Sequence, residues 1–184
     1  MKLSLKDINM IALFTALTVI LAQISIPIPF SPVPVTLSIF GVFLSSLILG
    51  TRNGILSQIV YILLGLVGVP VFAGFRGGLN VLLSPTGGYI ISYPFMALVI
   101  GLLVSRKKNA SFITMTGALL AGLVVCYTLG TSWLAVSAKL DPAKAISAGV
   151  IPFLPLDIVK AVISAALGLQ IRNALTKAGL VRAG

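Results

Sequence analysis

Long apolar runs, separated by short polar breaks, are the feature that most limits what this chain can fold into. Hydrophobic residues make up 58% of the sequence and charged residues only 9%, which excludes an ordinary soluble domain. An apolar helix of about 20 residues crosses the roughly 30 Å hydrocarbon core of a bilayer. A closed β-barrel would instead show segments of about ten residues that alternate apolar and polar, and the sequence lacks that pattern. The sequence therefore predicts an all-α integral membrane protein.

Six apolar runs are predicted to cross the membrane as helices and to form a single transmembrane domain over residues 1–184. The first is predicted to be a span and not a secretory signal, because it is longer than a signal core and no small-residue cleavage site follows it. Four prolines within 26–34 predict a stiff, extended first connection. The predicted spans are about 8–25, 35–49, 55–69, 89–104, 112–136 and 150–171.

Basic residues predict the orientation of these spans. The terminal segments and the second and fourth connections carry nine of them: Lys2, Lys6, Arg52, Arg106, Lys107, Lys108, Arg172, Lys177 and Arg182. The opposite connections carry only Arg76, Lys139 and Lys144. By the positive-inside rule, both termini are predicted to be cytoplasmic. The same rule accounts for the net charge of +10, so binding to nucleic acid is not expected.

Glycines and prolines interrupt the apolar pattern most strongly between residues 70 and 94. Glycine allows backbone conformations and close approaches that other residues resist, and proline removes a backbone donor. We therefore predict a shaped, outward-facing loop over residues 70–88 that acts as a lid. Gly77 and Gly78 are candidate ligand-binding positions, because they would let this backbone fold over a ligand.

Three side chains in or next to the lid are further candidates for ligand contacts. The guanidinium of Arg76 can hold a carboxylate through two hydrogen bonds, although a solvated surface charge is the simpler alternative. Asn80 can both donate and accept, although a lone loop asparagine commonly forms a turn. Tyr89 could form an apolar wall, although a packing or membrane-interface role is the more common one for such a tyrosine.

Asp157 and Lys160 form the sharpest polar signal, because they lie three residues apart in an otherwise apolar run. That spacing places both side chains on one face of a helix. An ionisable group at this depth costs several kcal/mol unless it is paired or lines a polar cavity. The pair either satisfies itself as a structural device or marks a functional site near the outer end of its helix, at the level of the lid.

The residue inventory limits the chemistry further. Histidine and glutamate are absent, and Asp7, Asp141 and Asp157 are the only acidic residues, so no metal site or cofactor-dependent catalysis is expected. Cys126 is the only cysteine and is predicted to be packing material. No GxxxxGK[ST] motif is present, so ATP would have to be bound by other chains.

The run PVFAGFRGGLNVLLSPTGGY, with PLDIVKA in the last span and ALFTAL in the first, resembles the BioY family of biotin-specific S components of energy-coupling factor (ECF) transporters. The resemblance implies a six-helix protein in the cytoplasmic membrane of a prokaryote, which binds biotin from outside with high affinity. It also implies a transmembrane coupling protein and two cytoplasmic ATPases as partners. It places Ala12 and Ala16 at the contact with the coupling protein and makes Asp157 and Lys160 binding residues.

The chemistry of biotin fits these candidate residues. Its ureido ring offers two N–H donors and one carbonyl, for which Asp157 can accept while Lys160 or Asn80 donates. Arg76 is the candidate partner for its carboxylate, with Lys160 as the alternative. Three other functions stay open from the sequence: an S component for another small vitamin, a small membrane enzyme acting on lipid, and a purely structural membrane partner.

Overall fold

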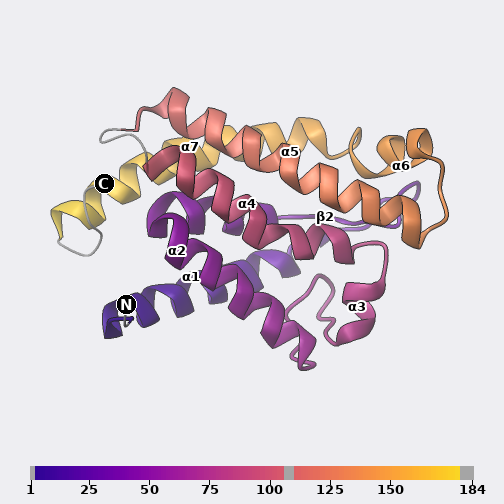
Figure 1. The fold of residues 1–184 in the computed structure, drawn as a ribbon, viewed down its shortest axis with the longest axis horizontal. Coiled ribbons are helices and arrows are strands. Elements are labelled where there is room, and N and C mark those ends of the chain that lie inside the picture. The colour runs from indigo at the N-terminus through magenta and orange to yellow at the C-terminus, as the bar shows by residue number, and fades with distance from the viewer. Residues whose placement is uncertain (1–2, 106–109, 179–184) are drawn as a thin grey trace.

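The computed structural model describes residues 3–105 and 110–178, so Lys2, Arg106, Lys107, Lys108 and Arg182 lie outside the described part. Long helices run side by side along the longest axis, and α1 begins at the end of the molecule where α7 finishes (Figure 1). The elements are α1 Leu5–Gln23, β1 Ser25–Ile26, β2 Val35–Thr36, α2 Ser38–Leu66, α3 Leu79–Leu83, α4 Gly87–Ser105, α5 Phe112–Ser137, α6 Pro142–Gly149 and α7 Leu154–Lys177.

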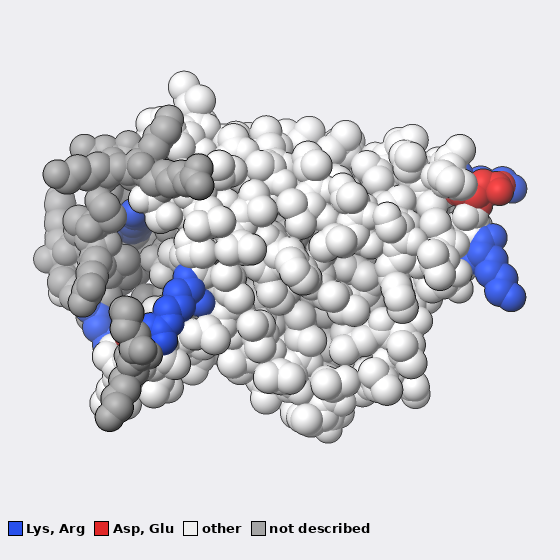
Figure 2. Space-filling model, in the orientation of Figure 1, with Lys and Arg blue, Asp and Glu red and all other residues white. Residues whose placement is uncertain are grey.

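The outer surface of the bundle matches a multi-pass membrane protein. Five described helices, α1, α2, α4, α5 and α7, are long and apolar enough to cross a bilayer. Figure 2 shows charged side chains at the two ends of the molecule, with a broad uncharged band between them. Large aliphatic side chains on this outer surface are exposed, among them Leu13, Val124 and Val159. Such a surface is stable in lipid and would be unstable in water.

Helix α2 covers most of the second and third predicted spans, although 35–36 form β2 and 67–69 follow the helix, and its two arms fold back on each other. Gly50 has non-helical angles (φ 74°, ψ −174°), a conformation that glycine adopts without steric cost. The side-chain amide of Gln58 donates to Ser45 Oγ at 2.9 Å. On one straight helix these residues would be separated by about 20 Å along the axis. The contact therefore requires that the chain reverses at Gly50, between an arm at 38–49 and an arm at 51–66.

Helix α4 lies at the centre of the bundle, where it packs against both α2 and α5, while α7 contacts the same two helices and α1 packs against α2. Buried side chains of α4 such as Met96 and Ile100 are completely shielded. At Gly101 the two backbones approach closely, since a Cβ there would lie 2.5 Å from the Cα of Thr51. This contact seats α4 next to the reversal in α2.

The connections at the opposite end from the termini are more structured than their sequences indicate. The proline-rich segment joins β1 to β2, which pair antiparallel with Ser25 opposite Thr36. The predicted lid contains the short helix α3, and α4 begins at Gly87, two residues before the predicted span. The polar connection before the last span forms α6, with Asp141 at its N-cap and proline at its first position, where the missing N–H costs no hydrogen bond.

We expect Gly101→Leu to destabilise the protein by about 1–3 kcal/mol or more, because the added side chain must displace the backbone at Thr51. Gly117→Leu is the matched control, since a Cβ at this exposed position in α5 meets nothing within 4 Å. Thermal unfolding of both purified variants in detergent measures the difference. Equal unfolding temperatures for the two variants would contradict the close packing of α4 on α2.

Candidate functional site

Asp157 and Lys160 lie in the first turns of α7 and form a buried ion pair. Lys160 Nζ is 2.8 Å from Asp157 Oδ1, and the two residues are 8% and 2% exposed. Asp157 also benefits from its place in the first turn, where the partial positive charge of a helix N-terminus favours a carboxylate. The two residues that the sequence predicted as a pair are therefore brought together in the interior.

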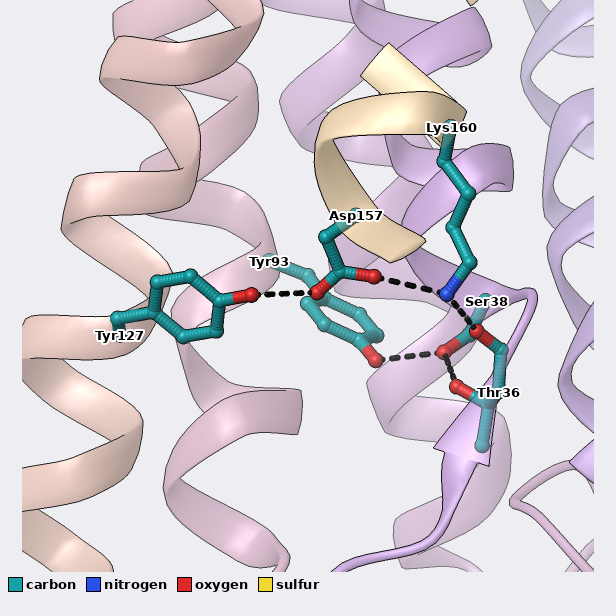
Figure 3. A network of polar contacts seen from close by, with 6 residues as sticks. All are labelled: Thr36, Ser38, Tyr93, Tyr127, Asp157 and Lys160. Atoms are coloured by element: carbon teal, nitrogen blue, oxygen red, sulfur yellow. Dashed lines mark hydrogen bonds and ion pairs between the residues drawn. The ribbon is translucent and has the colours of Figure 1, made fainter. Parts of the chain in front are cut away.

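A side chain and a backbone carbonyl from other elements complete the hydrogen bonding of this pair (Figure 3). The Tyr127 hydroxyl of α5 donates to Asp157 Oδ2 at 2.7 Å, and Lys160 Nζ donates to the carbonyl oxygen of Thr36 at 2.8 Å. The Thr36 hydroxyl lies 2.6 Å from Ser38 Oγ, which in turn lies 2.7 Å from the Tyr93 hydroxyl. The network thus joins α7, α5, β2, α2 and α4, and it satisfies groups whose burial without partners would cost free energy.

Four members of this network were not identified as site residues from the sequence. Tyr127, Thr36, Ser38 and Tyr93 are not among the candidates that the sequence suggests. A hydroxyl within an apolar run was the available signal, but serine, threonine and tyrosine occur in many such helices. Only the folded chain brings these hydroxyls together, because residues as far apart in the sequence as Thr36 and Lys160 must meet to make the contacts.

Two adjoining cavities open beside the network, and Val33, Pro34, Thr36, Tyr89 and Tyr93 line both. One has a volume of about 360 Å³ and holds Asp157, Lys160 and Tyr127 in its wall. The other has a volume of about 430 Å³ and is lined by Arg76 and Thr86 among others. Both volumes include space that is open to solvent, and the walls of the two cavities together carry the buried pair and Arg76.

Aromatic rings form an apolar wall of the larger cavity. Tyr61 contacts the Phe72 ring edge-on, with centroids 5.5 Å apart, and lies nearly parallel to Tyr93 at 6.2 Å. Phe72 packs directly over Gly65, where any side chain would collide with the ring. Phe72, Tyr61 and Tyr93 come from the lid, α2 and α4, so this wall exists only when the lid is folded against the bundle.

A tight turn in the lid places Arg76 at the larger cavity. Phe72 and Arg76 pair antiparallel through two backbone hydrogen bonds of 2.9 and 3.2 Å. Within this turn Gly74 and Phe75 both have positive φ, of 72° and 56°. Arg76 Nε donates to the carbonyl oxygen of Ala73 at 3.1 Å. None of the described residues accepts a hydrogen bond from its two terminal nitrogens. Those donors are available to an anion.

The remaining candidates from the lid do not line either cavity. Asn80 is exposed on α3, while Gly77 and Gly78 follow the turn in the sequence and are absent from the lining of both cavities. A side chain at Gly77 would collide with the carbonyl of Val69, and Gly78 has φ 92°. The two glycines therefore shape the lid backbone. Whether these three positions contact a bound ligand stays a prediction.

Tyr89 lines both cavities with its ring, and its hydroxyl is used for structure. The hydroxyl lies 3.1 Å from Thr131 Oγ1 and donates to the carbonyl oxygen of Gly149 at 3.0 Å. These bonds connect α4 to α5 and to the end of α6. Gly130 and Gly149 both pack so closely on this tyrosine that a Cβ at either would collide with it. Tyr89 is thus held firmly in the wall of both cavities.

Comparisons with known proteins agree with this architecture. The family model described as the BioY family matches residues 1–177. "Biotin transporter BioY" of Thermotoga maritima is 44% identical over 161 residues, which cover 88% of this chain and 92% of the relative. "Probable biotin transporter BioY" of Pyrococcus horikoshii is 45% identical over 156 residues, covering 85% and 90%.

A solved structure extends the similarity to three dimensions. It is described as the S-component for biotin from an ECF-type ABC transporter, and it superposes with a TM-score of 0.83 at 29% identity, covering 91% of each chain. The family match spans nearly all of the sequence, including the lid and the buried pair. The chain belongs to the BioY family.

Proposed function

We propose that this protein binds biotin with high affinity and acts as the substrate-specific S component of an ECF-type transporter. The observation that carries the proposal is the buried pair of Asp157 and Lys160 in the wall of a cavity that adjoins a second cavity lined by Arg76. An ion pair serving packing alone would need no such cavity. The names of the relatives and of the matching solved structure support biotin as the ligand.

The polar end of the site suits the ureido ring of biotin. Each oxygen of the Asp157 carboxylate accepts one protein hydrogen bond and retains capacity for another, so it can accept a ureido N–H. Lys160 has three N–H donors and uses two of them on Asp157 and Thr36, which leaves one for the ureido carbonyl. The aromatic wall of the larger cavity suits the sulfur-containing ring.

Arg76 suits the carboxylate of the valerate chain. Its terminal nitrogens can donate two parallel hydrogen bonds, the geometry in which guanidinium holds a carboxylate most strongly. Arg76 lines the larger cavity and the buried pair lines the smaller one, so an elongated ligand could reach both. Lys160, the alternative partner for the carboxylate, is already engaged by Asp157.

The fold also supports a topology and a set of partners. We count the arms of α2 as separate crossings, which makes six helices with both termini cytoplasmic in a prokaryotic plasma membrane. Ala12 and Ala16 are exposed on one face of α1, where small residues allow close helix contact, so we assign this face to the coupling protein. Two ATPase subunits would supply the energy.

Binding of labelled biotin to the purified protein in detergent tests the function directly. We expect a Kd in the nanomolar range, about −12 kcal/mol, because several charged hydrogen bonds and ring burial act together. An S component for another vitamin would instead prefer that vitamin in competition. Millimolar or weaker biotin binding would contradict the proposal.

We expect Asp157→Asn to weaken biotin binding by about 2 kcal/mol or more, which is roughly a thirtyfold rise in Kd. The amide can present a donor to the ureido N–H and leaves Lys160 without its carboxylate partner. Asp141→Asn is the matched control, because Asp141 is exposed and its ion-pair partner among the described residues is the exposed Lys144. Unchanged affinity for biotin in Asp157→Asn would show that the pair has a purely structural role.

Arg76→Ala is expected to weaken biotin more than a neutral biotin amide, because only biotin offers a carboxylate to the guanidinium. Binding constants for both ligands, in wild type and variant, give the difference. Lys144→Ala, which removes another exposed cation on the same side, is the control and should leave both ligands unaffected. Equal losses for biotin and the amide would show that Arg76 does not hold the carboxylate.

A further inference from the structure

Gln23, the last residue of α1, connects this helix to the lid through its side-chain amide. Its Nε2 donates to the carbonyl oxygen of Val71 at 3.1 Å, and its Oε1 accepts the backbone N–H of Phe75 at 2.9 Å. Nε2 also donates to Val19 of its own helix at 3.2 Å. The carbonyl accepts an N–H and the amine donates to carbonyls, so one orientation of the amide satisfies all three contacts.

The two lid contacts of Gln23 flank the turn that carries Arg76. Val71 lies just before the Phe72–Arg76 pair, and Phe75 lies inside the turn. Phe75 adopts φ 56°, which is unfavourable for a residue with a side chain, and the residue is 71% exposed, so packing does not explain the conformation. The hydrogen bond from its N–H to Gln23 stabilises this strained residue directly.

Residues on both sides of the contact line the larger cavity. Ala22, the neighbour of Gln23, lies in its wall together with Phe72, Ala73 and Arg76. Gln23 itself does not line either cavity, so it can act on a ligand only through the lid. The lid residues that it holds are remote from it in the sequence, with Phe75 52 residues away.

We propose that Gln23 is a positioning residue that clamps the 71–76 turn and so holds Arg76 against the ligand. This inference rests on the proposed binding of biotin. With the clamp formed, the guanidinium is in place before the carboxylate arrives, and the lid resists opening once it has bound. Without the clamp, the contacts that remain among the described residues include the Phe72–Arg76 pairing, the Arg76 Nε bond to Ala73 and the packing of Phe72 on Gly65 and Tyr61.

Gln23→Met tests the clamp, because methionine keeps the length of the side chain and removes both hydrogen bonds to the lid. We expect the dissociation rate of labelled biotin to rise about tenfold, with the unfolding temperature within a few degrees of wild type. The same substitution should raise the dissociation rate of the neutral biotin amide by at most about twofold. It should also raise the dissociation rate of biotin by at most about twofold when Arg76→Ala is already present. Gln170→Met is the matched control, since Gln170 is exposed on α7, and it should leave the rate unchanged.

Equal acceleration for biotin and its amide, or an unchanged rate, would overturn the proposal. Amide hydrogen exchange on the ligand-free protein provides a test that does not need biotin. Peptides covering 71–76 should exchange at least several-fold faster in Gln23→Met than in wild type or Gln170→Met, and equal exchange would overturn the clamp. A wild-type protein that binds no biotin would overturn the proposed function instead, and the exchange result would still decide whether Gln23 holds the turn.

Discussion

The burial of one ion pair inside an apolar helix bundle is the constraint on which the rest of the structure depends. Removing Asp157 and Lys160 from water costs several kcal/mol per charge, and their attraction offsets this only when the remaining hydrogen-bonding groups are also satisfied. Here Tyr127 and the Thr36 carbonyl complete the set. Because these partners lie on α5 and β2, the pair is stable only when the bundle and the proline-rich connection are both in place.

Close backbone contacts at glycine allow the helices to reach that arrangement. The bundle cannot rely on the hydrophobic effect between helices in lipid, so contact distance and hydrogen bonds carry more of the stability. Gly101 seats α4 against the reversal in α2, while Gly130 packs against the ring of Tyr89 and Gly149 against its hydroxyl. The same tyrosine lines both cavities, so helix packing and the shape of the site are coupled through one residue.

The lid and the buried pair line adjoining cavities and differ in how they are held. The pair lies on a regular helix and is shielded almost completely. The turn that carries Arg76 is short, contains two residues with positive φ and is held to α1 by a single amide side chain. A rigid polar centre beside a separate lid segment that carries an exposed cation is a suitable arrangement for a site that must both retain a ligand and release it.

The sequence by itself determined the membrane environment, the helical class and the pairing of Asp157 with Lys160, because apolar length and helical periodicity are local properties. It also predicted a connection between the spans that end at 49 and begin at 55, where the chain reverses at Gly50, and it singled out Arg76. Tertiary structure alone decided which hydroxyls join the network around the buried pair and that Gln23 reaches the lid. These contacts link residues that are between 30 and 124 positions apart, and local sequence does not specify such contacts. Tertiary structure also placed Asn80 on an exposed part of α3 and Gly77 and Gly78 outside the lining of both cavities, because local sequence does not specify which side of a folded loop faces a cavity.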